Sequence, residues 1–322
     1  MQQEYTYGVA RIRALESTLF TDDTISQLLQ CESYEECMNF LRGKGWGNGN
    51  TEQPFEEMLM EEKKRTWNVL YEIVKDRKAC EILTIPDEFH NLKAAIKQVC
   101  TQDKIENIFY THCNLQPEFL KECIRQAQYT SLPEQMSEAA KEATEILLRT
   151  GNGQLCDVII DRAALEAVRE AGEQSENDFI RQYADIQLTI ANIKTAVRCA
   201  ATGKDRSFLE KCLVSCRGIS ITDLCQAADN GLEGVCSYLE ASGYKEAVDA
   251  LKESKSVFEC WCDNRIMEEM KPQKYNAFTL GPIVAYVVAR EMEFKTVKIV
   301  LSGKLNHFDN DFIRERVRVM YA

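Results

Sequence analysis

The chain has 322 residues, of which 39 are Lys or Arg and 51 are Asp or Glu, so its net charge is −12. A chain this acidic repels phosphate groups, which argues against nucleic acid or anionic lipid as a partner held by bulk charge. Apolar residues make up 45% of the chain, and six prolines and 15 glycines are few for a protein with many turns. This composition excludes a disordered chain and disfavours a sandwich or barrel of many strands.

Helical periodicity dominates from the N-terminus onward. Apolar residues that recur every three or four positions predict helices after Pro54, after Pro86 and after Pro133. A helix is also predicted over 155–171, ending before Gly172, and a long one over 179–197. The remaining predicted helices span 209–217, 224–239 and 247–270. The best strand candidate, 296–300, continues a helical pattern, so the prediction is an all-α protein.

The same pattern recurs about every 100 residues. The stretch 89–97 matches 190–198 at Asn91/Asn192, at the following aliphatic residue and at Lys93/Lys194. A further 101 residues on, Phe294 and Lys295 keep the apolar and basic positions, and Glu293 replaces Asn. A second match, between 24–46 and 222–244, has a constant offset of 198. Two matches at consistent offsets predict three tandem helical units, at 1–105, 106–205 and 206–322.

Metal and catalytic constellations are hard to assemble from this sequence. Its 14 cysteines include no CxxC pair, and its three histidines, His90, His112 and His307, have no partner three or four residues away. The start of the chain lacks the apolar core of a secretory signal, so the thiols are expected to be reduced, buried and inert. No apolar run approaches the roughly 20 residues of a membrane span. We therefore expect no catalytic residue, metal ligand, cofactor or transmembrane segment.

Glycines provide two local expectations. The stretch 43–49 is rich in glycine, but it follows a predicted helix and lacks the Lys-Ser/Thr of a phosphate-binding loop, so a flexible surface loop is expected and no nucleotide site. Gly203 and Gly303 each follow a repeat position and are expected to end a helix.

Two sets of basic residues have alternative interpretations. Lys93, Lys194 and Lys295 are either solvated side chains, or members of an interhelical polar contact that recurs in each unit, or contacts to a partner. The segment 282–322 carries seven basic and five acidic residues, whereas the other 281 residues carry a net −14. Its arginines at 314, 316 and 318 either complement a helix C-terminus or contact an acidic partner.

Five blocks, spread from one end of the chain to the other, resemble the C subunit of V-type and A-type ATPases, whose eukaryotic counterpart is the d subunit. They are Tyr7–Glu16, Ala184–Arg198, Gly281–Lys295, Ile299–Asn306 and Ile313–Arg318. The resemblance implies an all-α protein of three similar helical units around a pseudo-threefold axis, shaped like a funnel. It also implies a non-catalytic coupling subunit of an ion-transporting rotary complex.

The resemblance further implies where such a subunit acts. It would sit at the cytoplasmic face of the membrane, on the proteolipid ring, and would receive the end of the central stalk with its D and F subunits. The alternative is a generic helical-repeat adaptor that binds another protein. An enzyme with an unrecognised site is a third possibility, which the missing constellations disfavour.

Overall fold

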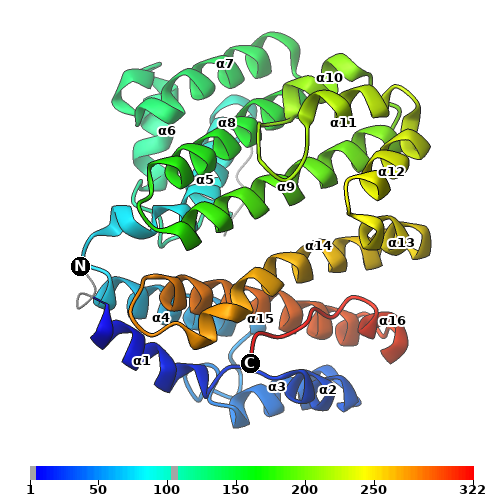
Figure 1. Ribbon diagram of the computed structural model, residues 1–322. Coiled ribbons are helices and arrows are strands. Elements are labelled where there is room, and N and C mark those ends of the chain that lie inside the picture. Colours follow the sequence, from blue (N-terminus) through cyan, green and yellow to red (C-terminus); the bar gives the residue numbers. More distant parts are fainter. Residues whose placement is uncertain (1–4, 103–107) are drawn as a thin grey trace. The chain divides into compact units, whose positions relative to one another are not determined.

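The computed structural model describes residues 5–102 and 108–322, and this part of the chain contains helices and no strand (Figure 1). The predicted boundary at 105/106 lies outside the described residues. The chain divides into two compact units, one formed by residues up to Arg77 together with Tyr244–Ala322, the other by Lys78–Gly243. These units do not follow the boundaries of the three sequence repeats, so the three-part division stays a prediction.

The first compact unit contains elements from both ends of the chain. They are α1 (Thr6–Glu16), α2 (Asp22–Gln30), α3 (Tyr34–Gly43), α4 (Phe55–Ile73), α13 (Lys245–Glu253), α14 (Lys255–Met270), the 3-10 helix η3 (Lys271–Tyr275), α15 (Gly281–Leu305) and α16 (Asn310–Arg314). Helix α15 is the centre of this unit, because it packs against α1, α2, α3, α4 and α14. Its residues from Gly281 to Arg290 are all buried, which explains the apolar run in the sequence.

The second compact unit contains the middle of the chain. After the 3-10 helix η1 (Arg77–Leu83), which crosses the boundary between the units, come α5 (Ile85–Thr101), α6 (Pro117–Arg125), the 3-10 helix η2 (Tyr129–Ser131), α7 (Glu134–Thr150), α8 (Gly153–Gln174), α9 (Asp178–Ala201), α10 (Arg206–Cys212), α11 (Ile221–Ala228) and α12 (Gly231–Ala241). Helix α8 packs against α5, α7 and α9, and α9 also packs against α11 and α12.

The predicted all-α class is confirmed, and so are the helix starts at three prolines. Pro54 and Pro133 occupy the N-cap positions of α4 and α7, and Pro86 lies in the first turn of α5. Proline suits these positions because the first N–H groups of a helix have no intrahelical partner. The strand candidate 296–300 lies within α15.

Three predicted helices are shorter or broken. Ser254 divides 247–270 into α13 and α14, because its hydroxyl accepts a hydrogen bond from Val257 N–H and so starts a new helix. The stretch 224–239 is divided at Asp229–Asn230, and Gly231 there has a φ of +66°. The helix predicted to continue to Arg217 ends at Cys212.

Two glycines were assigned the wrong role. Helix α8 does not end before Gly172 but continues to Gln174. A Cβ at Gly172 would lie 2.4 Å from the Ala184 Cβ, so this glycine allows α8 and α9 to approach closely. Gly303 likewise lies inside α15, where a Cβ would lie 2.5 Å from Ile313. Gly203 fits its prediction, because it follows α9 with a φ of +66°.

Candidate functional site: three polar clasps between helices and leading segments

The polar positions that recur in the sequence lie on three different helices. Asn91 is on α5, Asn192 is on α9 and Glu293 is on α15, and all three side chains are buried. Each binds the backbone of a segment that lies before a short helix: Tyr110 before α6, Val214 before α11 and Phe20 before α2. We call this segment a leading segment and the contact a polar clasp.

The two asparagines form the same clasp. Asn91 donates to the carbonyl of Tyr110 and accepts from its N–H, with both distances 2.9 Å. Asn192 donates to the carbonyl of Val214 at 2.7 Å and accepts from its N–H at 3.1 Å. A carboxamide can donate and accept at once, so it satisfies both backbone groups of a single residue. The clasp at Val214 also explains why the predicted helix 209–217 ends early.

Carboxylates on the same helices reinforce the amide clasps. Glu88 on α5 accepts hydrogen bonds from the N–H groups of Asn114 and Leu115. Asp185 on α9 accepts one from Arg217 N–H at 2.6 Å. Each leading segment in this unit is therefore held at two places by one helix, which fixes its direction as well as its position.

The third clasp uses a carboxylate. Glu293 Oε2 accepts a hydrogen bond from Phe20 N–H at 2.9 Å, and its Oε1 pairs with Arg290. Arg290 in turn donates to Glu62 on α4 at 2.9 Å. Glu62 also accepts from Gly47 N–H at 3.2 Å and from Arg65 at 2.6 Å. Every charge in this cluster is therefore paired, as buried ions require.

Burial raises the pKa of Glu293 to about 7, against the opposing effects of Arg290 and of the Phe20 N–H. Glu62 receives a second guanidinium from Arg65, which is half exposed. Glu293 has Arg290 and one N–H group. The pKa of Glu293 is therefore raised because its burial outweighs these two favourable contacts.

Aromatic rings cover this buried cluster. Trp46 stacks on Phe20 at 5.5 Å between ring centroids and meets Phe294 edge-on at 5.7 Å. The Arg290 guanidinium lies 4.6 Å from the Phe294 ring. The glycine-rich stretch 43–49 is therefore not simply a flexible surface loop: Trp46 and Gly47 are buried, and Gly47 N–H is bound to Glu62.

The repeated lysines fit the interhelical interpretation at two positions. Lys93 Nζ on α5 lies 2.6 Å from Asp161 on α8, and Lys295 on α15 pairs with Asp263 on α14. Burial alone would raise the pKa of Asp263, but Lys295 and Arg318 outweigh it and lower that pKa. Lys194 lies half-buried on α9. The apolar neighbours of the clasp residues, Leu92, Ile193 and Phe294, are all buried.

The C-terminal arginines have three different environments. Helix α16 ends at Arg314, which is exposed, so only this residue fits the helix-terminus interpretation. Arg316 lies beyond the helix, with its guanidinium 3.5 Å from the Phe312 ring centroid. Arg318 is buried and donates to Asp263 at 2.8 Å, so it belongs to the protein interior.

The histidines and most cysteines have structural surroundings. His90 Nε2 lies 3.0 Å from the Ile108 carbonyl, and His112 Nε2 lies 2.9 Å from Asp87. His307 takes a φ of +55° just after α15. All 14 cysteines are free thiols, and nine of them are buried. In the described ranges, no group of three or more His, Cys, Asp or Glu side chains is placed to hold a metal ion.

One pair of thiols differs from the prediction that the cysteines are inert. A hydrogen bond with Cys212 lowers the pKa of Cys199 to about 7, and the same interaction raises that of Cys212. Burial raises the pKa of Cys156 to about 11, which is the more usual behaviour in this protein.

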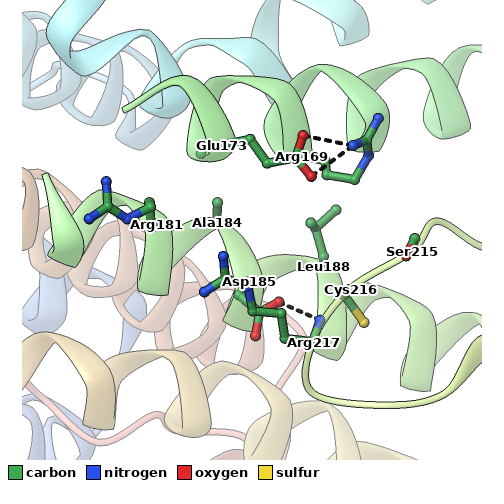
Figure 2. A pocket seen from close by; sticks show the side chains of 10 residues that line it. Arg169, Glu173, Arg181, Ala184, Asp185, Leu188, Ser215, Cys216 and Arg217 are labelled. Carbon is green, nitrogen blue, oxygen red and sulfur yellow. Dashed lines mark hydrogen bonds and ion pairs between the residues drawn. The ribbon is translucent and has the colours of Figure 1, made fainter. Parts of the chain in front are cut away.

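A cavity of about 130 Å³ lies between α8, α9 and the leading segment around Val214 (Figure 2). Its polar groups are largely committed. Arg169 pairs with Glu166 and Glu173, Asp185 holds Arg217 N–H, and the Cys216 sulfur accepts from Asn192 at 3.4 Å. Figure 2 shows the Glu173 carboxylate turned to Arg169 and the Asp185 carboxylate turned to the Arg217 backbone.

The architecture is that of an all-helical protein whose repeated positions hold segments together. A family model described as "ATP synthase (C/AC39) subunit" matches residues 8–316, so the chain belongs to this family. The C subunit of the V-type sodium ATPase of Enterococcus hirae is 23% identical, over 96% of this chain and 97% of the relative. The C subunit of the A-type ATP synthase of Methanocaldococcus jannaschii is 26% identical, over 96% and 85%. That of Methanosphaera stadtmanae is 21% identical, over 93% and 84%.

Sequence reasoning found the clasp residues but missed their partners. Phe20, Tyr110 and Val214 contribute backbone groups, which no residue pattern marks. It also missed the pair of Arg290 and Glu62. The available signal was Arg290 itself, a charged residue that directly follows the apolar run 283–289 and lies one helical turn before Glu293.

Proposed function

We propose that this chain is the non-catalytic C subunit of a rotary V-type or A-type ATPase, which couples the D–F central stalk to the proteolipid ring during ion transport. The observation that carries the proposal is the match to the family over residues 8–316, together with relatives named as C subunits that align along 93–96% of this chain. A match of this extent favours the whole subunit over a generic adaptor that shares only one repeat.

The order of the clasps supports a cyclic arrangement of three repeats. The last helix of the first repeat, α5, holds the segment that leads into the second, and α9 holds the segment that leads into the third. The long helix near the end of the third repeat, α15, holds Phe20 in the first. We propose that the repeats at 1–105, 106–205 and 206–322 close around a pseudo-threefold axis as a funnel that receives the stalk.

Buried clasps suit a part that transmits torque. A protein that links shaft to ring must pass rotation on without yielding at its joints. Breaking a buried hydrogen bond leaves a desolvated donor or acceptor, at a cost of about 1–3 kcal/mol each. Joints between repeats that depend on such bonds therefore resist small displacements, whereas joints made of exposed ion pairs would give way more easily.

The proposed location is peripheral, at the cytoplasmic face of the membrane. No helix in the described residues is both long and apolar enough to cross a bilayer. Contact with the membrane sector would then run through the proteolipid ring. The proposal assigns no nucleotide site to this chain.

Binding of the purified chain to a purified D–F complex tests this function. We expect saturable, one-to-one binding in biolayer interferometry, and no ATP binding by isothermal titration calorimetry at micromolar concentrations. A D–F complex that fails to bind, or ATP that binds the isolated chain, would contradict the proposal.

A further inference from the structure

A cavity of about 260 Å³ opens beside the start of α14, and we call it the C-terminal basic pocket. Its lining residues are Lys255, Ser256, Glu259, Ile299, Arg316 and Arg318. Three of these six are cationic and one is anionic, in a chain with a net charge of −12. The first turn of α14 adds the positive end of a helix dipole. In Figure 1, α16 and the start of α14 lie at the same end of this compact unit.

The two outer cations are available to a partner. Lys255 is exposed, and within the described part of the chain its ammonium group makes no ion pair or hydrogen bond. Arg316 is held in place from one side: it lies over the Phe312 ring and donates to the Phe312 carbonyl at 2.5 Å. Its contact with Glu315 is long, at 3.6 Å, and the Glu315 side chain is 53% exposed. Arg318, by contrast, is already paired with Asp263.

An exposed apolar surface adjoins the pocket through Arg316. The Phe312 side chain beneath this guanidinium is 42% exposed, and Phe308, whose ring centroid lies 5.0 Å from that of Phe312, is 50% exposed. Leu305, at the end of α15, is 61% exposed. Aromatic and arginine side chains together are typical of the strongest contacts in protein interfaces. An arginine already fixed on a ring loses little freedom on binding.

We propose that the C-terminal basic pocket and the adjoining surface of Leu305, Phe308 and Phe312 dock an acidic, amphipathic segment of another protein of the complex. Carboxylates of that segment would face Lys255 and Arg316, and its apolar side chains would cover the two rings. This inference rests on the proposed function, because it assumes a place in a complex. Charge complementarity selects the occupant: the pocket lining has three cations and one carboxylate, in a chain whose net charge is −12. A membrane surface fits less well, because an anionic bilayer would repel the acidic remainder.

Charge reversal at Lys255 is the sharpest variant. Lys255→Glu changes an exposed side chain whose ammonium group has no ion pair or hydrogen bond among the described residues, so the fold should be kept, which circular dichroism and the urea midpoint would verify. Lys64→Glu is the matched control, because Lys64 is an exposed lysine on α4 of the same compact unit. The probes are an immobilised D–F complex, a detergent-solubilised proteolipid ring, and vesicles with 30% phosphatidylserine.

We expect Lys255→Glu to weaken binding to one of the two protein probes by about fivefold, and Lys255→Glu/Arg316→Glu by more than tenfold, as close interfacial charges do. Phe308→Ser should weaken the same interaction, and Lys64→Glu should stay within twofold of the original chain. Added salt should weaken the unchanged protein more than the double variant.

Failure of the docking surface and failure of the proposed function would give different results. If the unchanged chain binds a protein probe and the Lys255 and Arg316 variants bind equally well, the docking surface is refuted and the proposed function stands. If the unchanged chain binds neither protein probe, both are refuted. Binding to the vesicles that depends on Lys255, without an effect on either protein probe, would replace the protein partner with a lipid surface.

Discussion

The clasps of both compact units hold a leading segment against a helix, but they use different side chains to do so. In the unit 78–243, neutral asparagines at 91 and 192 each bind both the N–H and the carbonyl of one residue. In the other unit, Glu293 can only accept, so it binds Phe20 N–H and needs Arg290 to balance its charge. Arg290 then needs Glu62. One change from amide to carboxylate thus brings a buried ionic cluster with it.

This difference separates two kinds of joint. The hydrogen bonds of the asparagines themselves carry no charge, so these bonds should be insensitive to pH and depend on geometry. The carboxylate clasp couples three charged residues on two helices. Removal of one of these side chains therefore leaves a buried charge without its partner. Its energetic weight should therefore be larger and its pH dependence stronger.

The largest effect is expected at Arg290. Arg290→Met keeps much of the volume but leaves Glu62 and Glu293 buried without their shared partner, so the free energy of unfolding should fall by about 3–5 kcal/mol. Urea denaturation monitored by circular dichroism measures this. Arg290→Lys keeps the charge but loses the forked geometry of the guanidinium. Its free energy of unfolding should lie between those of the original chain and of Arg290→Met. A loss below about 1 kcal/mol in Arg290→Met would contradict a buried cluster with paired charges.

A smaller effect is expected at Asn192. Asn192→Ala leaves the buried N–H and carbonyl of Val214 without partners, which should reduce stability by about 2–4 kcal/mol. Asn91→Ala should cost less, because Tyr110 is half-buried and water can reach its backbone. Asn192→Asp keeps the acceptor for the Val214 N–H and loses the donor to the Val214 carbonyl. This variant therefore separates the contributions of the two hydrogen bonds. Equal losses for Asn91→Ala and Asn192→Ala would show that burial of the leading segment is not what sets the cost.

The pH dependence of stability should distinguish the carboxylate clasp. The pKa of Glu293 is raised to about 7 in the folded state from about 4.5 in the unfolded chain. The folded state therefore binds the proton more tightly, and this contribution to stability is complete below pH 4.5 and is lost as the pH rises through 7. Glu293→Gln cannot titrate there. Its stability relative to the original chain should rise by about 2 kcal/mol between pH 5 and pH 8.

Urea midpoints of both proteins across this pH range provide the measurement, and Asn192→Ala is the control that should show no such trend. A difference between Glu293→Gln and the original chain that stays constant with pH would mean that Glu293 does not titrate in this window.

The smallest effect is expected at the repeated lysines. Lys93→Met removes a partly exposed ion pair with Asp161 and should change stability by less than about 1 kcal/mol. Lys295→Met should matter still less, because Asp263 keeps Arg318. A loss above about 2 kcal/mol for Lys93→Met, seen in the same urea assay, would move this residue into the group of clasp residues.

Periodicity and proline positions were enough to predict the helical class and the starts of α4, α5 and α7. The breaks at Ser254 and Asn230 were missed, because apolar spacing continues across them while capping and a positive φ interrupt the backbone. Gly172 and Gly303 were misassigned for a related reason. A glycine required by a neighbouring helix has the same appearance in the sequence as one that ends its own helix.

The recurrence of Asn91, Asn192 and Glu293 marked the clasp positions, since buried polar residues at repeated sites need partners. Their partners could not be predicted, because Phe20, Tyr110 and Val214 take part through backbone atoms. The ionic contacts of Glu293 also could not be predicted from the replacement of Asn by Glu at this repeat position. They depend on Arg290 and Glu62, and the contact between α15 and α4 brings together residues more than 220 positions apart.

The most direct test of the coupling role is an add-back experiment on membranes that contain the proteolipid ring but lack both this chain and the stalk. Labelled D–F complex is added with or without the purified chain, and the membranes are collected by sedimentation. The proposed function predicts that D–F sediments with the membranes only when the chain is present, in a one-to-one ratio with it. D–F that sediments equally well without the chain, or that stays in solution with it, would contradict the role of a link between stalk and ring.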